Sequence, residues 1–266
     1  MATIHDEASV NAAAIYASRE AGDFRGATLL HCLSHALANT GDALVCPTLH
    51  EFKVHWHQLM SHSEYAKRFY FDKVGRRAPH ITNFTRWYVS WEETRDMLRD
   101  FDQLLPFLKA YLADRGRDVP SVSRCIQLLE TGLAPIRFEM IVAVEHSRLL
   151  CKTCYFLEGD GFLFPYAANK LMEAWRGLDP SQPLTAREEA FVSSFAAQTR
   201  SDINVARTHW RGIREAILRP AFTFLGLMLP AQPPPALQPG ADSRLKKKGK
   251  KKQIRYTCPS PSVTHP

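Results

Sequence analysis

The sequence predicts a mainly α protein with a small α/β segment at its N-terminus and a disordered tail at its C-terminus. Three observations support this fold class. Apolar residues recur at steps of three and four between residues 47 and 228, which is the period of an amphipathic helix. Two short strand-like runs flank a helix-like run within residues 1–46. Residues 230–266 are rich in Pro and Lys and poor in large apolar side chains.

The N-terminal segment has the strand, helix, strand order of an α/β unit. The runs ATIHD and GATLLH are predicted strands, and ASVNAAAIYASREAG between them is a predicted helix. The second strand runs into a further predicted helix, CLSHALANTGDAL. Two strands alone do not make a stable sheet, so we expect this unit to be the edge of something larger.

Helical period and capping signals then predict two helices, PTLHEFKVHWHQLMSH and SEYAKRFYFDKVG. The first carries an apolar stripe that includes Phe52 and Trp56. His55, His57 and His62 are predicted to lie on its polar, solvated side or at its end. The second is predicted to begin at a capping Ser63 and to end at Gly75.

The next predicted helix begins with Ser90 and Glu93, which have the spacing of a capping box, and Pro106 is expected to kink or divide it. A shorter amphipathic helix is predicted over residues 119–132. A largely apolar, central helix is predicted over residues 134–161. Further helices are predicted over the ranges 163–177, 184–203 and 205–228, the last of them interrupted near Pro220.

The net charge of +7 belongs to the tail. Residues 241–266 contain eight Lys and Arg against the single acid Asp242, and the remaining residues hold equal numbers of basic and acidic side chains. The run LKKKGKKKQIR suits a nuclear-import signal or an electrostatic contact with phosphates, and a solvated tail that only aids solubility is the plainer alternative. A nuclear location is therefore expected, with the cytoplasm as the alternative.

Neither a membrane span nor a secretory signal is readable, because no uncharged apolar run of about 18 residues exists and the N-terminus lacks a basic, then apolar, segment. We therefore expect an intracellular protein without a membrane partner. The six cysteines are scattered through helix-like segments, which favours reduced thiols.

Few residues suit catalysis or metal binding. Asp6 follows the first strand, where a carboxylate can face a metal or a phosphate, although a helix N-cap is the commoner role for Asp there. Cys32 and His35 lie three apart on one helical face. A zinc site needs about four ligands, which favours a buried, hydrogen-bonded His35. No metal site and no cofactor is therefore predicted.

The stretch ITNFTRWYVSWEE has two possible interpretations, packing in the core and contact with a nucleic acid. Trp87 and Trp91 share one helical face, and packing in the core is the default interpretation. Arg86 beside Trp87 at a helix start also suits a platform on which an unpaired base stacks while the guanidinium contacts a phosphate.

Three stretches in this order resemble blocks of the hAT superfamily of DNA transposases, and together they place the resemblance over roughly residues 3–228. HDEASVNAAA looks like the Asp-x-Ala-x-x-Asn block of that family, and LLHCLSHALANTGDAL is similar to its Cys-x-x-His block. NFTRWYVSWEETRDMLRDFDQLLPFL resembles the Thr-Arg-Trp segment that opens a large helical insertion. LLCKTCYFLEGDG and, faintly, ILRPAFTFL resemble later blocks.

The resemblance implies a ribonuclease-H-like sheet interrupted by a helical insertion, with Mg²⁺ or Mn²⁺ held by two Asp and one Glu in intact members. On that basis Asp6 matches the second Asp, and Trp87 matches a Trp that lies near the active site and stacks on a flipped base, with Arg86 and Thr85 beside it in the same motif. Cys32 and His35 match a pair that supports the core and DNA handling and does not hold the catalytic metal. The implied organisation is a partial ribonuclease-H-like remnant over residues 1–46, an all-helical insertion domain over 47–229 and a disordered tail over 230–266.

The resemblance therefore implies a transposase-derived protein that is not an enzyme by itself, since one Asp cannot assemble a two-metal site. DNA binding is expected through the helical domain and the basic tail, by residues Arg86, Trp87, Lys246, Lys247, Lys248, Lys250, Lys251 and Lys252. The alternatives are a helical interaction scaffold, whose exposed faces are covered by self-association or a partner protein, a fragment without function, and a nuclease that acts together with a full-length transposase.

Overall fold

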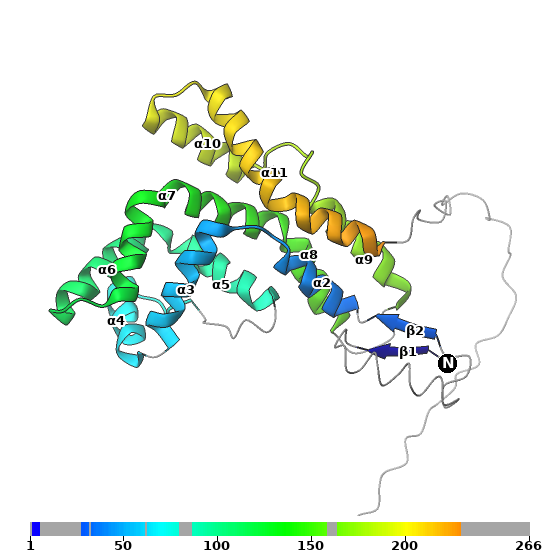
Figure 1. Ribbon diagram of the computed structural model, residues 1–266, viewed down its shortest axis with the longest axis horizontal. Coiled ribbons are helices and arrows are strands. Elements are labelled where there is room, and N and C mark those ends of the chain that lie inside the picture. The colour runs from blue at the N-terminus through cyan, green and yellow to red at the C-terminus, as the bar shows by residue number, and fades with distance from the viewer. Residues whose placement is uncertain are drawn as a thin grey trace, which may run out of the picture. The chain divides into compact units, whose positions relative to one another are not determined.

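A computed structural model describes residues 2–5, 28–31, 33–61, 63–79, 87–158 and 164–229 of the chain. These residues fall within one compact unit, Met1–Leu229. Their fold is mainly α, as predicted (Figure 1). The elements are β1 (Ala2–His5), β2 (Thr28–His31), α2 (Leu33–Asp42), α3 (Pro47–Ser61), α4 (Glu64–Val74), α5 (Trp87–Arg99), α6 (Phe101–Arg115), α7 (Pro120–His146), α8 (Arg148–Leu157), α9 (Phe164–Gly177), α10 (Ala186–Thr199) and α11 (Ile203–Met228).

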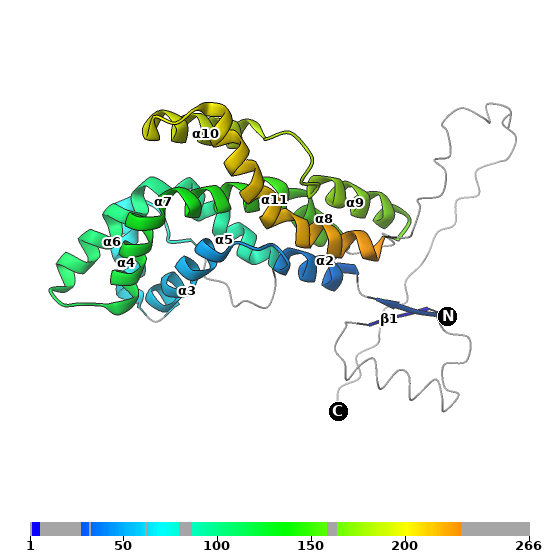
Figure 2. The ribbon, with the colours of Figure 1, turned by 45° about the horizontal axis from the view of Figure 1, so that its top comes forward.

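Helix α7 is the centre of the helical body and contributes to both of its hydrophobic cores (Figure 2). One core gathers side chains of α3, α4, α5 and α6 against residues such as Ile136 and Met140 of α7. The other gathers side chains of α2, α8, α9, α10 and α11 against Phe138 and Val142. These two pairs lie on different sides of one helix, because residues two apart on an α-helix point in different directions.

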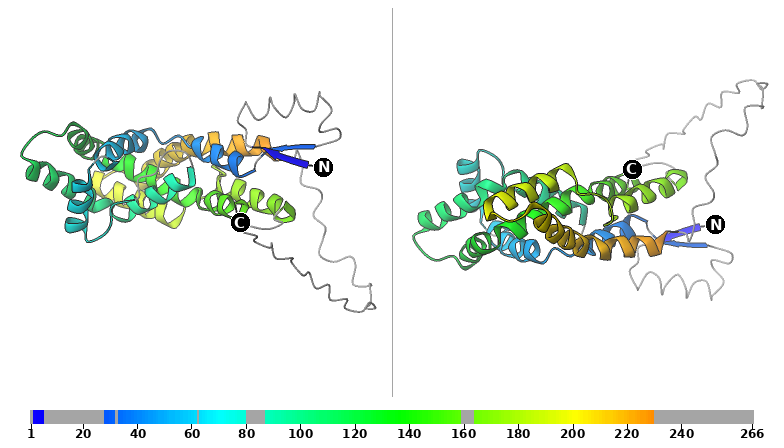
Figure 3. Two further views of the ribbon diagram at one scale, coloured as in Figure 1. Left: turned by 90° about the horizontal axis from the view of Figure 1, so that it is seen from below. Right: turned by 90° about the horizontal axis from the view of Figure 1, so that it is seen from above.

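The N-terminal strands form the parallel pair that the sequence predicts, with Ala2 opposite Thr28 and His5 opposite His31. The predicted helix between them lies outside the described residues. Helix α2, which follows β2, packs against α8 and α11, and the two views of Figure 3 show it beside α11. Leu37 of α2 is fully buried in the second core. This helix therefore belongs to the helical body, although its sequence lies within the segment assigned to the α/β remnant.

Helices α3 and α4 lie where the sequence predicts them, and α4 has both of its predicted caps. The Ser63 hydroxyl accepts a hydrogen bond from the Ala66 N–H at 3.0 Å, which satisfies one of the free donors of the first turn of α4. Gly75 ends the same helix with φ at 73°, a left-handed conformation. Glycine adopts this conformation with little strain because it has no Cβ.

The predicted capping box at Ser90 and Glu93 is wrong, because α5 begins at Trp87 and both residues lie inside it. Their side chains are instead engaged by Lys53 of α3. The break that was expected at Pro106 occurs at Asp100, between α5 and α6, and Pro106 is accommodated inside α6. Pro106 lies in the second turn of α6, where only one backbone hydrogen bond of a short helix is lost.

Three other boundaries differ from the prediction. Residues 119–132 and the following apolar run form one helix, α7, which is kinked where Gly132 leaves helical geometry with φ −128° and ψ 26°. This apolar run in turn divides at Ser147 into α7 and α8. Helix α11 continues across Pro220 without the expected interruption. Among the described residues, no helix has both the length and the apolar character that a membrane span requires.

Candidate nucleic-acid interface

The predicted site residues fall mostly outside the part of the chain that the structure describes. Asp6, Cys32, Arg86 and the tail lysines between Lys246 and Lys252 are all outside it. The backbones of His35, in α2, and of Trp87, the first residue of α5, are described. Helices α2 and α5 pack against each other, so the structure brings together the two helices that carry these residues.

Trp91 lies one helical turn after Trp87 and is a structural residue. Its side chain packs against both hydrophobic cores, and its indole Nε1–H donates to the carbonyl oxygen of Val144 in α7 at 3.1 Å. The guanidinium of Arg95 lies 5.3 Å from the centre of its ring. Core packing, the default interpretation of this tryptophan pair, is therefore correct for Trp91.

A cavity of about 610 Å³ opens beside the first turns of α5. It lies within the size range of small-molecule and cofactor sites, about 300–1,000 Å³. Its walls come from the end of α2, the link to α3, α3 itself, α5 and α7. The lining residues are Gly41, Asp42, Leu44, Val45, Cys46, Pro47, Leu49, His50, Lys53, Ser90, Trp91, Thr94 and Ala143.

One wall of this cavity is a buried polar network centred on Lys53. The ammonium group donates to the Ser90 hydroxyl at 2.7 Å and to the Thr94 hydroxyl at 3.3 Å, and it lies 3.0 Å from Glu93 Oε2. The other carboxylate oxygen, Oε1, is 2.6 Å from Nε2 of His57. Glu93 is completely buried, and a buried carboxylate is stable only when such partners compensate for the loss of water.

The position of His57 corrects the prediction of a solvated histidine face. Only 7% of His57 is exposed, and its ring faces Glu93 of α5. The apolar stripe of α3 indicated the face that enters the core but not the buried polar residues beside it. The sequence therefore did not predict the contacts among Lys53, His57 and Glu93. Lys53 and His57 lie beside the apolar stripe of α3, and their partner Glu93 lies in another helix.

Cys46 lines the cavity, but its thiol is not poised for reaction. Burial raises the pKa of Cys46 to about 12, the nearby Glu139 carboxylate adds to the increase, and Lys53 opposes it. Burial likewise raises the pKa of Cys125, of Cys151 and of Cys154 to about 12. All four are free thiols, as predicted, and a thiol with so high a pKa is a weak nucleophile at neutral pH.

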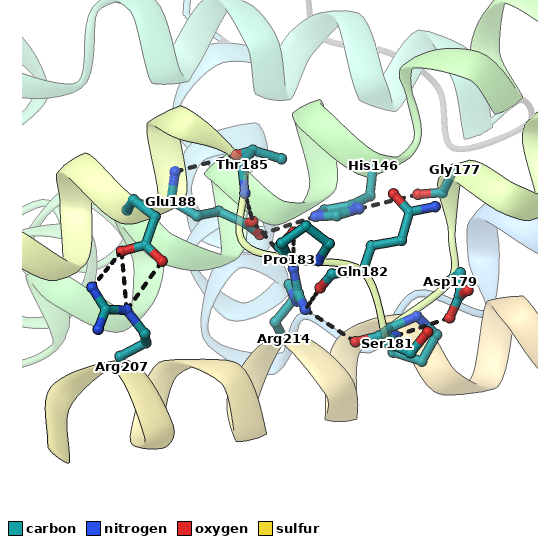
Figure 4. A network of polar contacts seen from close by, with 12 residues as sticks. His146, Gly177, Asp179, Ser181, Gln182, Pro183, Thr185, Glu188, Arg207 and Arg214 are labelled. Carbon is teal, nitrogen blue, oxygen red and sulfur yellow. Dashed lines mark hydrogen bonds and ion pairs between the residues drawn. The ribbon is translucent and has the colours of Figure 1, made fainter. Parts of the chain in front are cut away.

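A second buried network fastens the loop between α9 and α10 (Figure 4). His146 contacts the carbonyl oxygen of Gly177 through Nδ1 and Glu188 through Nε2, both at 3.0 Å. Arg214 of α11 lies 3.4 Å from Glu188 and donates to the backbone carbonyls of Pro180, Gln182 and Pro183. These partners are backbone carbonyls of the loop, the last carbonyl of α9 and a carboxylate of α10, which identifies the network as structural.

The pKa of Glu188 is lowered although the residue is completely buried. Burial by itself would raise it. The hydrogen bond and charge of His146, the Thr185 N–H and the charge of Arg214 together outweigh burial. Glu188 also forms a capping box with Thr185 at the start of α10. One carboxylate therefore joins the start of α10 to α7 and α11.

Among the residues that the structure describes, no three His, Cys, Asp or Glu side chains gather as ligands for a metal ion. Comparison of the chain with protein-family models, with curated proteins and with solved structures gives no match.

Proposed function

We propose that this protein binds DNA with unpaired bases at the start of α5 and in the cavity beside it. The observation that carries the proposal is the position of the cavity. Ser90, Trp91 and Thr94 line it, and they belong to the first two turns of the helix that begins at Trp87. Trp87, which the sequence marks together with Arg86 as a base platform, is the first residue of this helix, and the cavity beside the following turns has a size that suits a small ligand group.

Stacking and charge attraction supply the binding energy in this proposal. Trp87 stacks on an unpaired base, and Arg86 contacts the neighbouring phosphate. The tail lysines, from Lys246 to Lys252, attract the backbone without regard to sequence. Because each neutralised phosphate releases counterions, affinity falls steeply as salt concentration rises.

The origin that we propose is the one implied by the resemblance, a hAT transposase. We assign binding, and no strand cleavage, to this chain. Asp6 is the remnant acid in that proposal, and Cys32 and His35 are a pair that supports the core and DNA handling. A nuclear location follows if the tail is an import signal.

The direct test is the affinity of the full chain for a labelled DNA hairpin with unpaired bases, measured by fluorescence anisotropy. Trp87→Ala is expected to weaken binding by about 1–3 kcal/mol, roughly 5- to 150-fold, which is the range for loss of one stacked base. Tyr166→Ala is the matched control, because Tyr166 is an aromatic residue of α9 with 61% of its surface exposed. Equal affinities for the wild type and Trp87→Ala would refute the stacking role.

Light scattering with and without DNA separates this function from that of an interaction scaffold. A monomer that binds the hairpin supports the proposal. Self-association of the purified chain, without binding to the hairpin at low salt, would instead support the scaffold.

A further inference from the structure

We propose that Arg95, Arg99 and Arg76 form a track of phosphate contacts for one nucleic-acid strand that leaves the start of α5. We refer to these three residues as the arginine track. This inference rests on the proposed function and adds to it the path of one nucleic-acid strand.

The register of α5 relates the track to the first residue of this helix. Trp91, Arg95 and Arg99 follow Trp87 at steps of four, so these positions succeed one another along one side of the helix. Each step advances about 6 Å along the helix axis. Arg76, which follows the end of α4, reaches the far end of this row at Asp100.

Two carboxylates hold the three guanidinium groups in place. Asp96 Oδ1 lies 3.2 Å from Arg95 Nη2 and 3.3 Å from Arg99 Nη1. Asp100 accepts from Arg99 Nη2 at 2.8 Å through Oδ2 and from Arg76 Nη1 at 2.9 Å through Oδ1. The result is a continuous row in which guanidinium and carboxylate groups alternate, and the cations occupy both ends.

The cations of this row are far more exposed than the acids. The side chains of Arg95, Arg99 and Arg76 are 48%, 45% and 56% exposed, whereas those of Asp96 and Asp100 are 24% and 2% exposed. The pKa of Asp100 is lowered, chiefly by the hydrogen bond from Arg99. Asp100 therefore stays charged and continues to bind its arginine partners.

Each guanidinium also keeps donors for an outside acceptor. A guanidinium has five N–H groups, and Arg76 uses only Nη1 in its contact with Asp100. Charge-assisted, bidentate hydrogen bonds from such groups suit phosphate oxygens. A strand lying on this surface would therefore meet fixed, half-exposed guanidinium groups before it met a carboxylate.

Trp91 supports the track and does not stack on a base. Its ring lies 5.3 Å from the Arg95 guanidinium, and its indole N–H is bonded to Val144. The ring therefore orients Arg95 through a cation–π contact. Trp87 then stacks on a base and the arginines contact phosphates. Sites for single strands combine aromatic residues and positive charges in this way.

The test is a salt titration of binding to a short labelled oligothymidine, which contains no duplex. The variants Arg95→Gln, Arg99→Gln and Arg76→Gln are each expected to weaken binding at low salt and to reduce the slope of log affinity against log salt by about 0.7. Arg95→Lys keeps the charge and should keep the slope. Thermal melting of each variant shows that it is folded.

Arg187→Gln is the matched control, since Arg187 of α10 is 53% exposed and lies 3.1 Å from Glu145 in a similar surface ion pair. It should leave the slope unchanged. If the wild type binds but none of the three track variants changes the slope, the track is refuted and the proposed function stands. If the wild type fails to bind any DNA, both are refuted. Equal competition by polyglutamate of matched charge would also refute a nucleic-acid track, because it would show an acidic-protein surface.

Discussion

Glu139 of α7 caps the N-terminus of α3 through Leu49, whose backbone N–H donates to Glu139 Oε2 at 2.6 Å. The other carboxylate oxygen accepts from the Thr48 hydroxyl at 2.9 Å and from the Thr48 N–H at 3.3 Å. A side chain from a distant helix thus satisfies the free donors at the start of α3. This contact fixes α3 against α7, and with it the position of the Lys53 wall of the cavity.

Glu139→Ala is expected to destabilise the fold by about 1–3 kcal/mol, because it leaves buried N–H groups without an acceptor. Glu139→Gln should cost less, since its amide oxygen still accepts. Urea denaturation measures both. Glu130→Gln serves as a control at an exposed ion pair with Lys109 and should lie within about 0.5 kcal/mol of the wild type. Equal losses for the Ala and Gln variants would contradict the capping role.

The buried Lys53 and Glu93 pair predicts an asymmetric double-mutant cycle. Lys53→Met alone should cost about 3–5 kcal/mol, because it removes one partner of a buried charge. The double variant Lys53→Met with Glu93→Met removes both charges, which should recover part of this loss. Guanidinium chloride denaturation measures the coupling. Additive losses in the double variant would show that the two charges do not depend on each other.

Stability should fall in acid partly through Glu188. Its pKa is lower in the folded protein than in the unfolded chain, so its contribution is present above the unfolded value, near 4.3, and is lost as pH falls through the folded value. Glu188→Gln should therefore be less stable than the wild type at neutral pH, and the difference should shrink as the solution is acidified. Thermal melting from pH 7 to pH 3 measures it. A constant difference across this range would contradict the pKa assignment.

The four described thiols should resist alkylation in the folded protein. Burial raises the pKa of Cys46 to about 12, so almost no thiolate is present at pH 8. We expect iodoacetamide to modify Cys46, Cys125, Cys151 and Cys154 much more slowly without urea than with it, as read by peptide mass spectrometry. Cys46 is the critical residue because it lines the cavity. Rapid modification of Cys46 in the native protein would show that its thiol is accessible and activated.

The sequence by itself determined the helical class, most helix positions and the parallel strand pair. These features depend on local spacing. The apolar stripe with Phe52 and Trp56 marks α3, and Ser63 and Gly75 mark the ends of α4. Amphipathic period and caps are local properties, so one sequence is enough to read them.

Only the tertiary structure decided which polar residues are buried and what they hold. Ser90 and Glu93 have the spacing of a cap, yet they lie inside α5, and their side chains contact Lys53 and His57 of another helix. Arg95, Arg99 and Arg76 become one row only where the end of α4 meets Asp100. Burial and charge pairing depend on contacts between segments far apart in the chain. Local periodicity carries no information about such contacts, which is why these residues were found in the structure and not in the sequence.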